Sequence, residues 1–223
     1  MKSTRPTASQ ANVRARRRPR RAAAAAPYHH GSLREAMLGA AERILERDGI
    51  AGLTLRAAAR EAGVSHAAPK NHFGDVRGLL SELAAVGFLR FGAAMVANVR
   101  EHAPSKARLA AIGQGYVMFA KQNPGLFLLM FRGERLDFSR PALRTAADAA
   151  FAVLAGAVGA RQPRETPLTL PQAARITAAW SLVHGFAMLM LDARLKPLIA
   201  RMPDGTDEIA LLEAILNGPT AQS

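Results

Sequence analysis

A group of small and polar side chains between positions 65 and 73 has the chemistry needed to contact nucleic acid. Its members are Ser65, His66, Ala67, Ala68, Lys70, Asn71 and His72. Imidazole and amide groups can donate and accept hydrogen bonds, and an ammonium group can approach a phosphate. DNA base edges offer matching hydrogen-bond partners and thymine methyl groups, which an alanine methyl can contact. Taken singly, each side chain could instead be a solvated surface residue.

Two short helices joined by a tight turn are predicted to hold this group. Thr54 can cap the first helix through its hydroxyl. The apolar face of that helix consists of Leu55, Ala58, Ala59 and Ala62. Gly63 should end it, because glycine adopts the left-handed conformation at little cost. Ser65 can cap a second helix that ends near Phe73. This is the pattern of a helix-turn-helix, whose second helix can enter a DNA major groove, although ordinary helical hairpins share the spacing.

The flanking sequence predicts more helices around the pair. Upstream, Ser32 and Glu35 have the spacing of a capping box, and helically spaced apolar residues continue to a stop at Asp48-Gly49. Downstream, Asp75 is the expected cap of a long helix. Helices are predicted over residues 79–102, 105–122, 126–131, 141–158, 171–195 and 206–216. No stretch alternates with a period of two, so we expect an all-α fold without a sheet.

Tyr28 to about Phe91 resembles the DNA-binding domain of the TetR family of bacterial transcriptional regulators. The matching run is MLGAAERILERDGIAGLTLRAAAREAGVSHAAPKNHFGDVRGLL. The opening YHHGSLR and the SHAAP start of the second helix resemble one subgroup, whose C-terminal domain carries a W-x-x-x-H-G signature. Trp180 to Gly185 has that pattern. Composition predicts a disordered basic tail (1–27). The resemblance implies a three-helix helix-turn-helix DNA-binding domain (28–78) and a larger helical ligand-binding and dimerisation domain (79–218).

The same resemblance assigns roles to individual positions. Residues 66 to 68 would approach base edges, and Thr54 would meet a phosphate at a helix N-terminus. Lys70 stands where the family often has tyrosine, and Val76, followed by Arg77, stands where a lysine commonly begins the fourth helix. The implied DNA-binding residues are Thr54, Ser65, His66, Ala67, Ala68, Lys70, Asn71, His72 and Arg77.

Aromatic and methionine side chains in the larger domain could line a pocket for a small hydrophobic molecule. The residues expected to bind it are Met118, Phe119, Phe127, Met130, Phe131, Phe151, Trp180, His184 and Met188. Tyr116 and Phe186 belong to the same apolar group. The alternative for any one of them is plain core, and for His184 a core histidine whose hydrogen bonds are satisfied.

The last two predicted helices carry more apolar residues than one core needs. These are Leu182, Phe186, Leu189, Ile209, Leu212, Ile215 and Leu216. Paired across a two-fold axis, they would form a four-helix homodimer interface. The family resemblance then implies a repressor that binds a palindromic, double-stranded DNA operator and that a small-molecule effector releases.

The charge of the chain is concentrated at its N-terminus. The 223 residues carry a net charge of +13. Eight basic residues precede residue 27 without an acid: Lys2, Arg5, Arg14, Arg16, Arg17, Arg18, Arg20 and Arg21. Such an arm could follow DNA phosphates or remain a solvated tail.

Several classes of protein are disfavoured by the sequence. There are no cysteines, which excludes disulfides and thiolate metal sites. We found no run of about 20 apolar residues and no secretory signal, and therefore expect a cytoplasmic protein without a membrane span. No catalytic or nucleotide-binding motif occurs, so we expect no enzyme activity, no metal and no cofactor. The competing class is a nonspecific DNA-coating protein that binds through its arginine tail.

Overall fold

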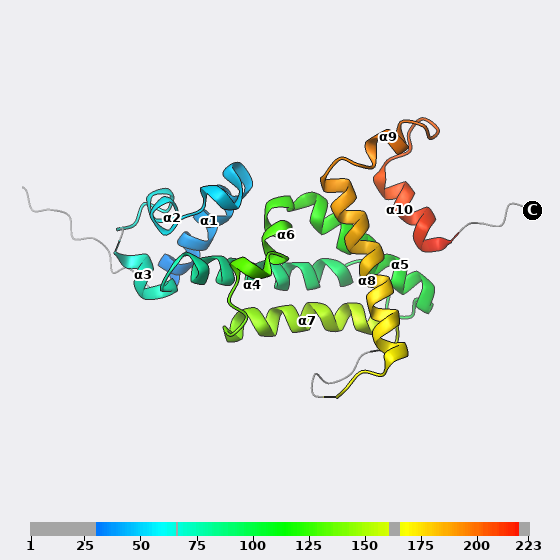
Figure 1. Ribbon diagram of the computed structural model, residues 1–223, viewed down its shortest axis with the longest axis horizontal. Helices are drawn as coiled ribbons and strands as arrows, with labels where there is room; N and C mark the ends of the chain where they lie inside the picture. Colours follow the sequence, from blue (N-terminus) through cyan, green and yellow to red (C-terminus); the bar gives the residue numbers. More distant parts are fainter. Residues whose placement is uncertain (1–29, 66, 161–165, 219–223) are drawn as a thin grey trace, which may run out of the picture.

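The computed structural model describes residues 30–65, 67–160 and 166–218, and their regular structure is entirely helical (Figure 1). The elements are α1 (His30–Gly52), α2 (Leu55–Glu61), α3 (Ala68–Phe73), α4 (Val76–Val96), α5 (Ser105–Gln122), α6 (Pro124–Met130), η1 (Gly133–Arg135), α7 (Pro141–Ala157), α8 (Leu170–Leu191), α9 (Lys196–Ile199) and α10 (Glu208–Asn217). No strand occurs in these described ranges. The all-α prediction is confirmed.

The first helix of the helix-turn-helix has the predicted ends. Thr54 is extended, and its Oγ1 accepts a hydrogen bond from the Ala57 amide at 3.0 Å. Gly63 has φ 68°, in the left-handed region that favours glycine. The Val64 amide then donates to the Ala59 carbonyl at 3.0 Å, as in a Schellman motif. The predicted cap and the predicted stop of α2 are both confirmed.

Two other predicted caps are wrong. Helix α1 begins at His30, so Ser32 lies within the helix and not at its N-cap position. Helix α3 begins at Ala68 with Ala67 as its N-cap, so Ser65 does not cap it. Pro69 lies in the first turn of α3, where an amide would have no intrahelical partner. Proline thus starts this helix without a side-chain cap.

Helix α4 connects the helix-turn-helix to the rest of the molecule. Asp75 is its predicted cap, and its Oδ1 accepts a hydrogen bond from the Gly78 amide at 2.8 Å. The helix spans Val76–Val96 and not the predicted 79–102. Helix α8 is also shorter than predicted: it ends at Leu191, because Ala193 has φ 56° and the Arg194 amide donates to the Leu189 carbonyl at 2.8 Å. A separate short helix, α9, follows and was not predicted.

The larger part of the molecule is built around α4. Helix α7 runs beside it and α5 also packs on it, while α8 and α10 pack on α5 (Figure 1). A glycine permits the close approach of α5 to α4. A Cβ on Gly115 of α5 would lie 2.4 Å from the Ala94 carbonyl oxygen of α4.

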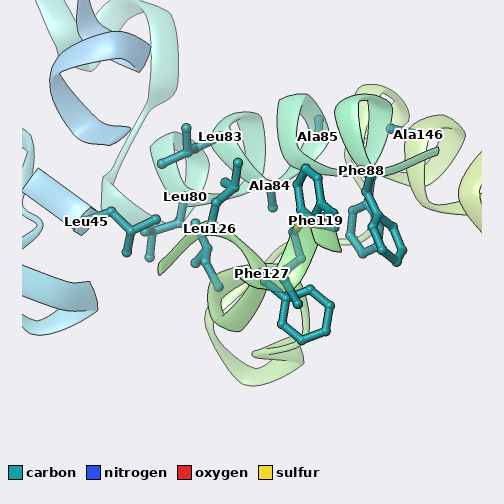
Figure 2. Packing of buried hydrophobic residues seen from close by; sticks show 14 of the residues in the cluster. Leu45, Leu80, Leu83, Ala84, Ala85, Phe88, Phe119, Leu126, Phe127 and Ala146 are labelled. Atoms are coloured by element: carbon teal, nitrogen blue, oxygen red, sulfur yellow. The ribbon is translucent and has the colours of Figure 1, made fainter. Parts of the chain in front are cut away.

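A single buried apolar cluster joins the helix-turn-helix to the larger helical part. Figure 2 shows Leu45 of α1, Leu80 of α4 and Leu126 of α6 within it. A Cβ on Gly125 would lie 3.1 Å from the Leu45 carbonyl oxygen, so the start of α6 is in direct contact with α1. The helix-turn-helix and the larger helical part therefore share one continuous packed core.

Two helices, α4 and α8, are long and apolar enough to cross a membrane by length and composition alone. This corrects the expectation that no such segment exists. In α4, 56% of the most apolar window is buried, so its hydrophobicity is explained by its central place in the core. In α8 only 22% of that window is buried, so much of its apolar surface faces outward.

Candidate functional site

The helix-turn-helix presents a polar and basic surface. Thr54, Lys70 and Asn71, three of the residues predicted to bind DNA, are exposed on it. Arg56 and Arg60 of α2 are exposed as well. The sequence analysis did not include these two arginines, although their spacing of four places both on the polar side of a helix whose other side is apolar. The surface therefore combines cations with hydrogen-bonding groups.

The remaining predicted residues around α3 differ in their surroundings. His66 lies outside the described residues, and for Ala68 only the backbone, at the start of α3, is described. Ser65 and Ala67 are exposed in the turn before the helix. His72 is half-buried, with its ring centroid 6.4 Å from that of Phe73.

Arg77, the last residue of the predicted DNA-binding set, bonds to the segment between α6 and α7. Its Nε and Nη2 donate hydrogen bonds to the Leu136 carbonyl at 3.1 and 2.6 Å. Leu136 lies between α6 and α7, far along the chain. The guanidinium therefore ties the start of α4 to the larger helical part of the molecule, a role the sequence analysis did not foresee.

A partly open cavity of about 510 Å³ lies in the larger helical part. Its lining comes from α4, α5, α6, α7, α8 and the segment between α6 and α7. The lining residues are Phe88, Phe91, Met95, Tyr116, Met130, Phe131, Gly133, Phe138, Arg144, Ala147, Asp148, Ala150, Phe151, Leu154 and Trp180. Aromatic rings dominate these walls, which suits a compact apolar molecule.

Only part of the predicted ligand set lines this cavity. Met130, Phe131, Phe151 and Trp180 do, whereas Phe119 and Phe127 are buried core residues. Met118, His184 and Met188 are half-buried outside the lining. Phe151 is the only α7 residue of this lining that was predicted, and the wall that α4 contributes was missed. Helix α4 is apolar on nearly all sides, so its pattern gives no sign of which face borders a cavity.

A chain of three polar groups includes two residues of the cavity wall, Tyr116 and Trp180. Trp180 Nε1 donates a hydrogen bond to the Tyr116 hydroxyl at 3.2 Å, and that hydroxyl lies 2.9 Å from Nδ1 of His184. Burial lowers the pKa of His184, which favours the neutral imidazole. Since the phenol accepts from Trp180, its own proton is available to Nδ1. Burial also raises the pKa of Tyr116, so the phenol keeps its proton.

The cavity has one charged region. It contains the basic residue Arg144 and the acidic residue Asp148, which lie one helical turn apart on α7. Phe151 and Trp180, 44% and 39% exposed, line the cavity and also reach solvent. A ligand would thus meet an apolar interior and a charged group on one wall.

Comparisons with known proteins agree with this architecture. Residues 109–215 match the family model described as "Tetracyclin repressor-like, C-terminal domain". No curated protein matches the chain. Among solved structures, a protein of unknown function from Rhodococcus sp. RHA1 shares 36% sequence identity, with a TM-score of 0.66 and with 86% of this chain and 95% of that chain covered.

Two more distant structures share the fold. One is a candidate TetR-family transcription regulator from Shewanella sp. PV-4, with 19% identity, a TM-score of 0.56 and coverage of 82% of this chain and 95% of that chain. The other is the transcriptional regulator FadR from Bacillus subtilis in complex with stearoyl-CoA, with 16% identity, a TM-score of 0.54 and coverage of 82% and 95%. This chain therefore has the fold of the TetR-family transcriptional regulators, and residues 109–215 are similar to the tetracyclin repressor-like C-terminal domain.

Proposed function

We propose that the protein is a cytoplasmic, homodimeric repressor that binds a palindromic DNA operator and releases it when a small apolar ligand occupies the cavity. The observation that carries this proposal is one molecule with both a helix-turn-helix and an aromatic cavity, joined by a continuous core. Residues 28–78 act as the DNA-binding domain and residues 79–218 as the regulatory and dimerisation domain. The W-x-x-x-H-G subgroup is supported by Trp180 and His184, which both approach the Tyr116 hydroxyl.

The DNA-binding role rests on the exposed surface of α2 and α3. Lys70, Arg56 and Arg60 can neutralise phosphates, and Asn71 can bond to a base edge. The N-terminus of α2, capped by Thr54, is suited to a phosphate. Ser65, Ala67 and the neighbouring residues at the start of α3 would enter the major groove, as in other helix-turn-helix proteins.

Dimerisation rests on the outward faces of α8 and α10. On α8, Ala174, Ala178, Leu182, Gly185 and Leu189 recur every three or four residues along one side. Leu182 and Leu189 are 41% and 47% exposed, and a Cβ on Gly185 would meet nothing within 4 Å. Small residues would let a second α8 approach closely, with Ile215 of α10 beside it. This pairing would place two recognition helices roughly 34–36 Å apart, one turn of DNA.

The effector is proposed to be a small, mainly apolar molecule that occupies the cavity. The aromatic lining supports this class, and FadR, which has the same fold, was solved with stearoyl-CoA. Occupancy can weaken operator binding only if the ligand has a higher affinity for the form of the protein that does not bind DNA. No catalytic step is assigned to any residue of the protein.

Selection of genomic fragments on the immobilised full-length protein tests the proposal. A specific regulator should recover palindromic sites and bind them at least about 10³-fold more tightly than random duplex at physiological salt. Deletion of residues 1–26 should reduce affinity and its salt dependence while the preferred sequence stays the same. Equal affinity for selected and random duplexes would support the nonspecific DNA-coating protein instead.

A further inference from the structure

The segment that joins α6 to α7, residues 131–140 and hereafter the connector, forms part of the cavity wall. Phe131, Gly133 and Phe138 of the connector line the cavity. The Phe131 ring packs against Phe88 and Phe127, at centroid distances of 5.9 and 4.9 Å. Any molecule that fills the cavity therefore contacts the connector directly.

The opposite side of the connector is hydrogen-bonded to the start of α4. The Leu136 carbonyl accepts from Arg77, as described above, and the Asp137 amide donates to Ser81 Oγ at 2.9 Å. Ser81 is fully buried, and its hydroxyl donates in turn to the Arg77 carbonyl at 2.7 Å. Apart from the phenol of Tyr116, Ser81 is the one buried polar side chain among the described residues. The Ser81 hydroxyl thus holds the connector to α4 through its two hydrogen bonds. Breaking them costs free energy, because the hydroxyl would be left buried and unpaired.

Arg140 extends this contact to the recognition helix. Its Nη2 donates a hydrogen bond at 2.9 Å to the carbonyl of Phe73, the last residue of α3. Nη1 lies 3.4 Å from Oε1 of Glu82, which also pairs with Arg34 of α1. A cation at the last carbonyls of a helix stabilises that end. The arginine thus bonds to the C-terminus of the helix that would lie in the DNA groove.

The path of Arg140 to Phe73 depends on a glycine. A Cβ on Gly78 would lie 1.9 Å from the Phe73 carbonyl oxygen and 2.5 Å from Arg140 Nη2. Only a residue without a side chain leaves room for this hydrogen bond at the first turn of α4. The contact is therefore built into the local sequence and is not an incidental surface pair.

We propose that Arg140 is a positioning residue that transmits the occupancy of the cavity to the recognition helix through the connector. In the ligand-free protein, Arg140 holds the end of α3 in the orientation that binds DNA. A ligand that displaces Phe131 or Phe138 moves the connector and weakens the Arg140–Phe73 and Arg77–Leu136 hydrogen bonds, which frees α3. By linkage, operator binding must lower the affinity of the protein for the ligand by the same factor. This inference rests on the proposed function and specifies its regulation.

The test compares wild-type protein with Arg140→Gln and with Arg132→Gln, its matched control. Arg132 is in the same connector, but its side chain is 58% exposed and pairs only distantly, at 4.0 Å, with Glu134. The probe is 1-anilinonaphthalene-8-sulfonate, whose binding in the cavity is followed by energy transfer from Trp180, the only tryptophan of the chain. Operator affinity is measured with and without saturating probe, using a site recovered by genomic selection. Ala147→Trp, which adds a large side chain to the cavity wall, provides a second way to fill it.

In wild-type and Arg132→Gln proteins, the probe or the added tryptophan should lower operator affinity by about fivefold or more, within the usual range of allosteric coupling. In Arg140→Gln, operator affinity without the probe should fall at least about fivefold, and the further effect of the probe should approach onefold. Probe affinity for the free protein should change less than about threefold, because Arg140 does not line the cavity.

An Arg140→Gln protein whose probe effect on operator affinity equals that of wild type would overturn the inference while leaving the proposed function intact, since Arg140 would then only support the structure. Specific operator binding by wild type that neither cavity filling nor the probe alters would overturn both the inference and the proposed release by a ligand. A wild-type protein that binds all duplexes equally would instead contradict the proposed function itself.

Discussion

Single residues in this protein have effects that their types alone do not reveal, and the glycines show this most directly. Gly39 and Gly78 both lie in helices with negative φ. A Cβ on Gly39 would meet only the end of Arg43, at 3.6 Å, whereas one on Gly78 would collide with the Phe73 carbonyl and with Arg140. The same substitution should therefore have opposite signs at the two positions.

Gly39→Ala should raise the free energy of unfolding by roughly 0.5–1 kcal/mol, because alanine favours the helix. Gly78→Ala should lower it by about 1–3 kcal/mol, because the backbone must shift to relieve the collision. Urea denaturation followed by circular dichroism measures both. A Gly78→Ala protein as stable as wild type would show that the junction of α3 and α4 has more room than the structure indicates.

His184 predicts how stability depends on pH. Burial lowers its pKa below the ordinary value of 6.5, so the unfolded chain binds the proton at a higher pH than the folded chain. The stability that the neutral imidazole contributes is complete above about pH 6.5 and is lost as the pH falls through that value toward the folded pKa. The Tyr116 hydroxyl bond, which uses Nδ1 as its acceptor, would be lost in the same range.

Between about pH 7.5 and 5.5 the free energy of unfolding should decrease by less than the limit of about 1.4 kcal/mol per pH unit for one proton, since His184 is only half-buried. His184→Gln should give a flatter profile, and His102→Gln, at an exposed position, is the matched control. Denaturation curves at each pH provide the measurement. A steeper profile after removal of His184 would contradict the assignment.

Helices as elements show where sequence patterns sufficed and where they did not. Thr54 and Asp75 were predicted as caps, and each accepts the expected amide three residues later. Ser65 has the same chemistry but is not a cap, because Pro69 sets the start of α3 at Ala68. A capping residue can be recognised from its own type only when nothing nearby determines the helix start more strongly.

This difference between the two predicted caps is measurable. Thr54→Ala should lower the free energy of unfolding by about 1 kcal/mol, the usual cost of losing an N-cap. Ser65→Ala should change it by less than about 0.5 kcal/mol, as expected of an exposed residue without such a role. Thermal or urea denaturation of the two variants decides between them. Equal losses in both would restore Ser65 as a cap in solution.

At the scale of the whole molecule, the fold class and the apolar residues were predictable, but the cavity was not. Phe127 and Phe131 have the same type and are one turn apart, yet only Phe131 lines the cavity. The distinction depends on how α7 packs on α4, which no local pattern encodes. Phe88 and Phe91 of α4 were missed for the same reason.

The exposed face of α8 is the largest-scale feature that invites a test, because its Leu182 and Leu189 side chains are 41% and 47% exposed in the described part of one chain. Leu182→Glu would place a charge in the proposed two-fold interface, where burial without a partner is costly. Sedimentation should show a monomer, and operator affinity should fall because one subunit reaches only half of a palindrome. Leu89→Glu is the matched control: Leu89 is 60% exposed on α4, away from α8 and α10, and its variant should remain a dimer. If Leu182→Glu dimerises with the same concentration dependence as wild type, the dimer interface must lie on another face of the molecule.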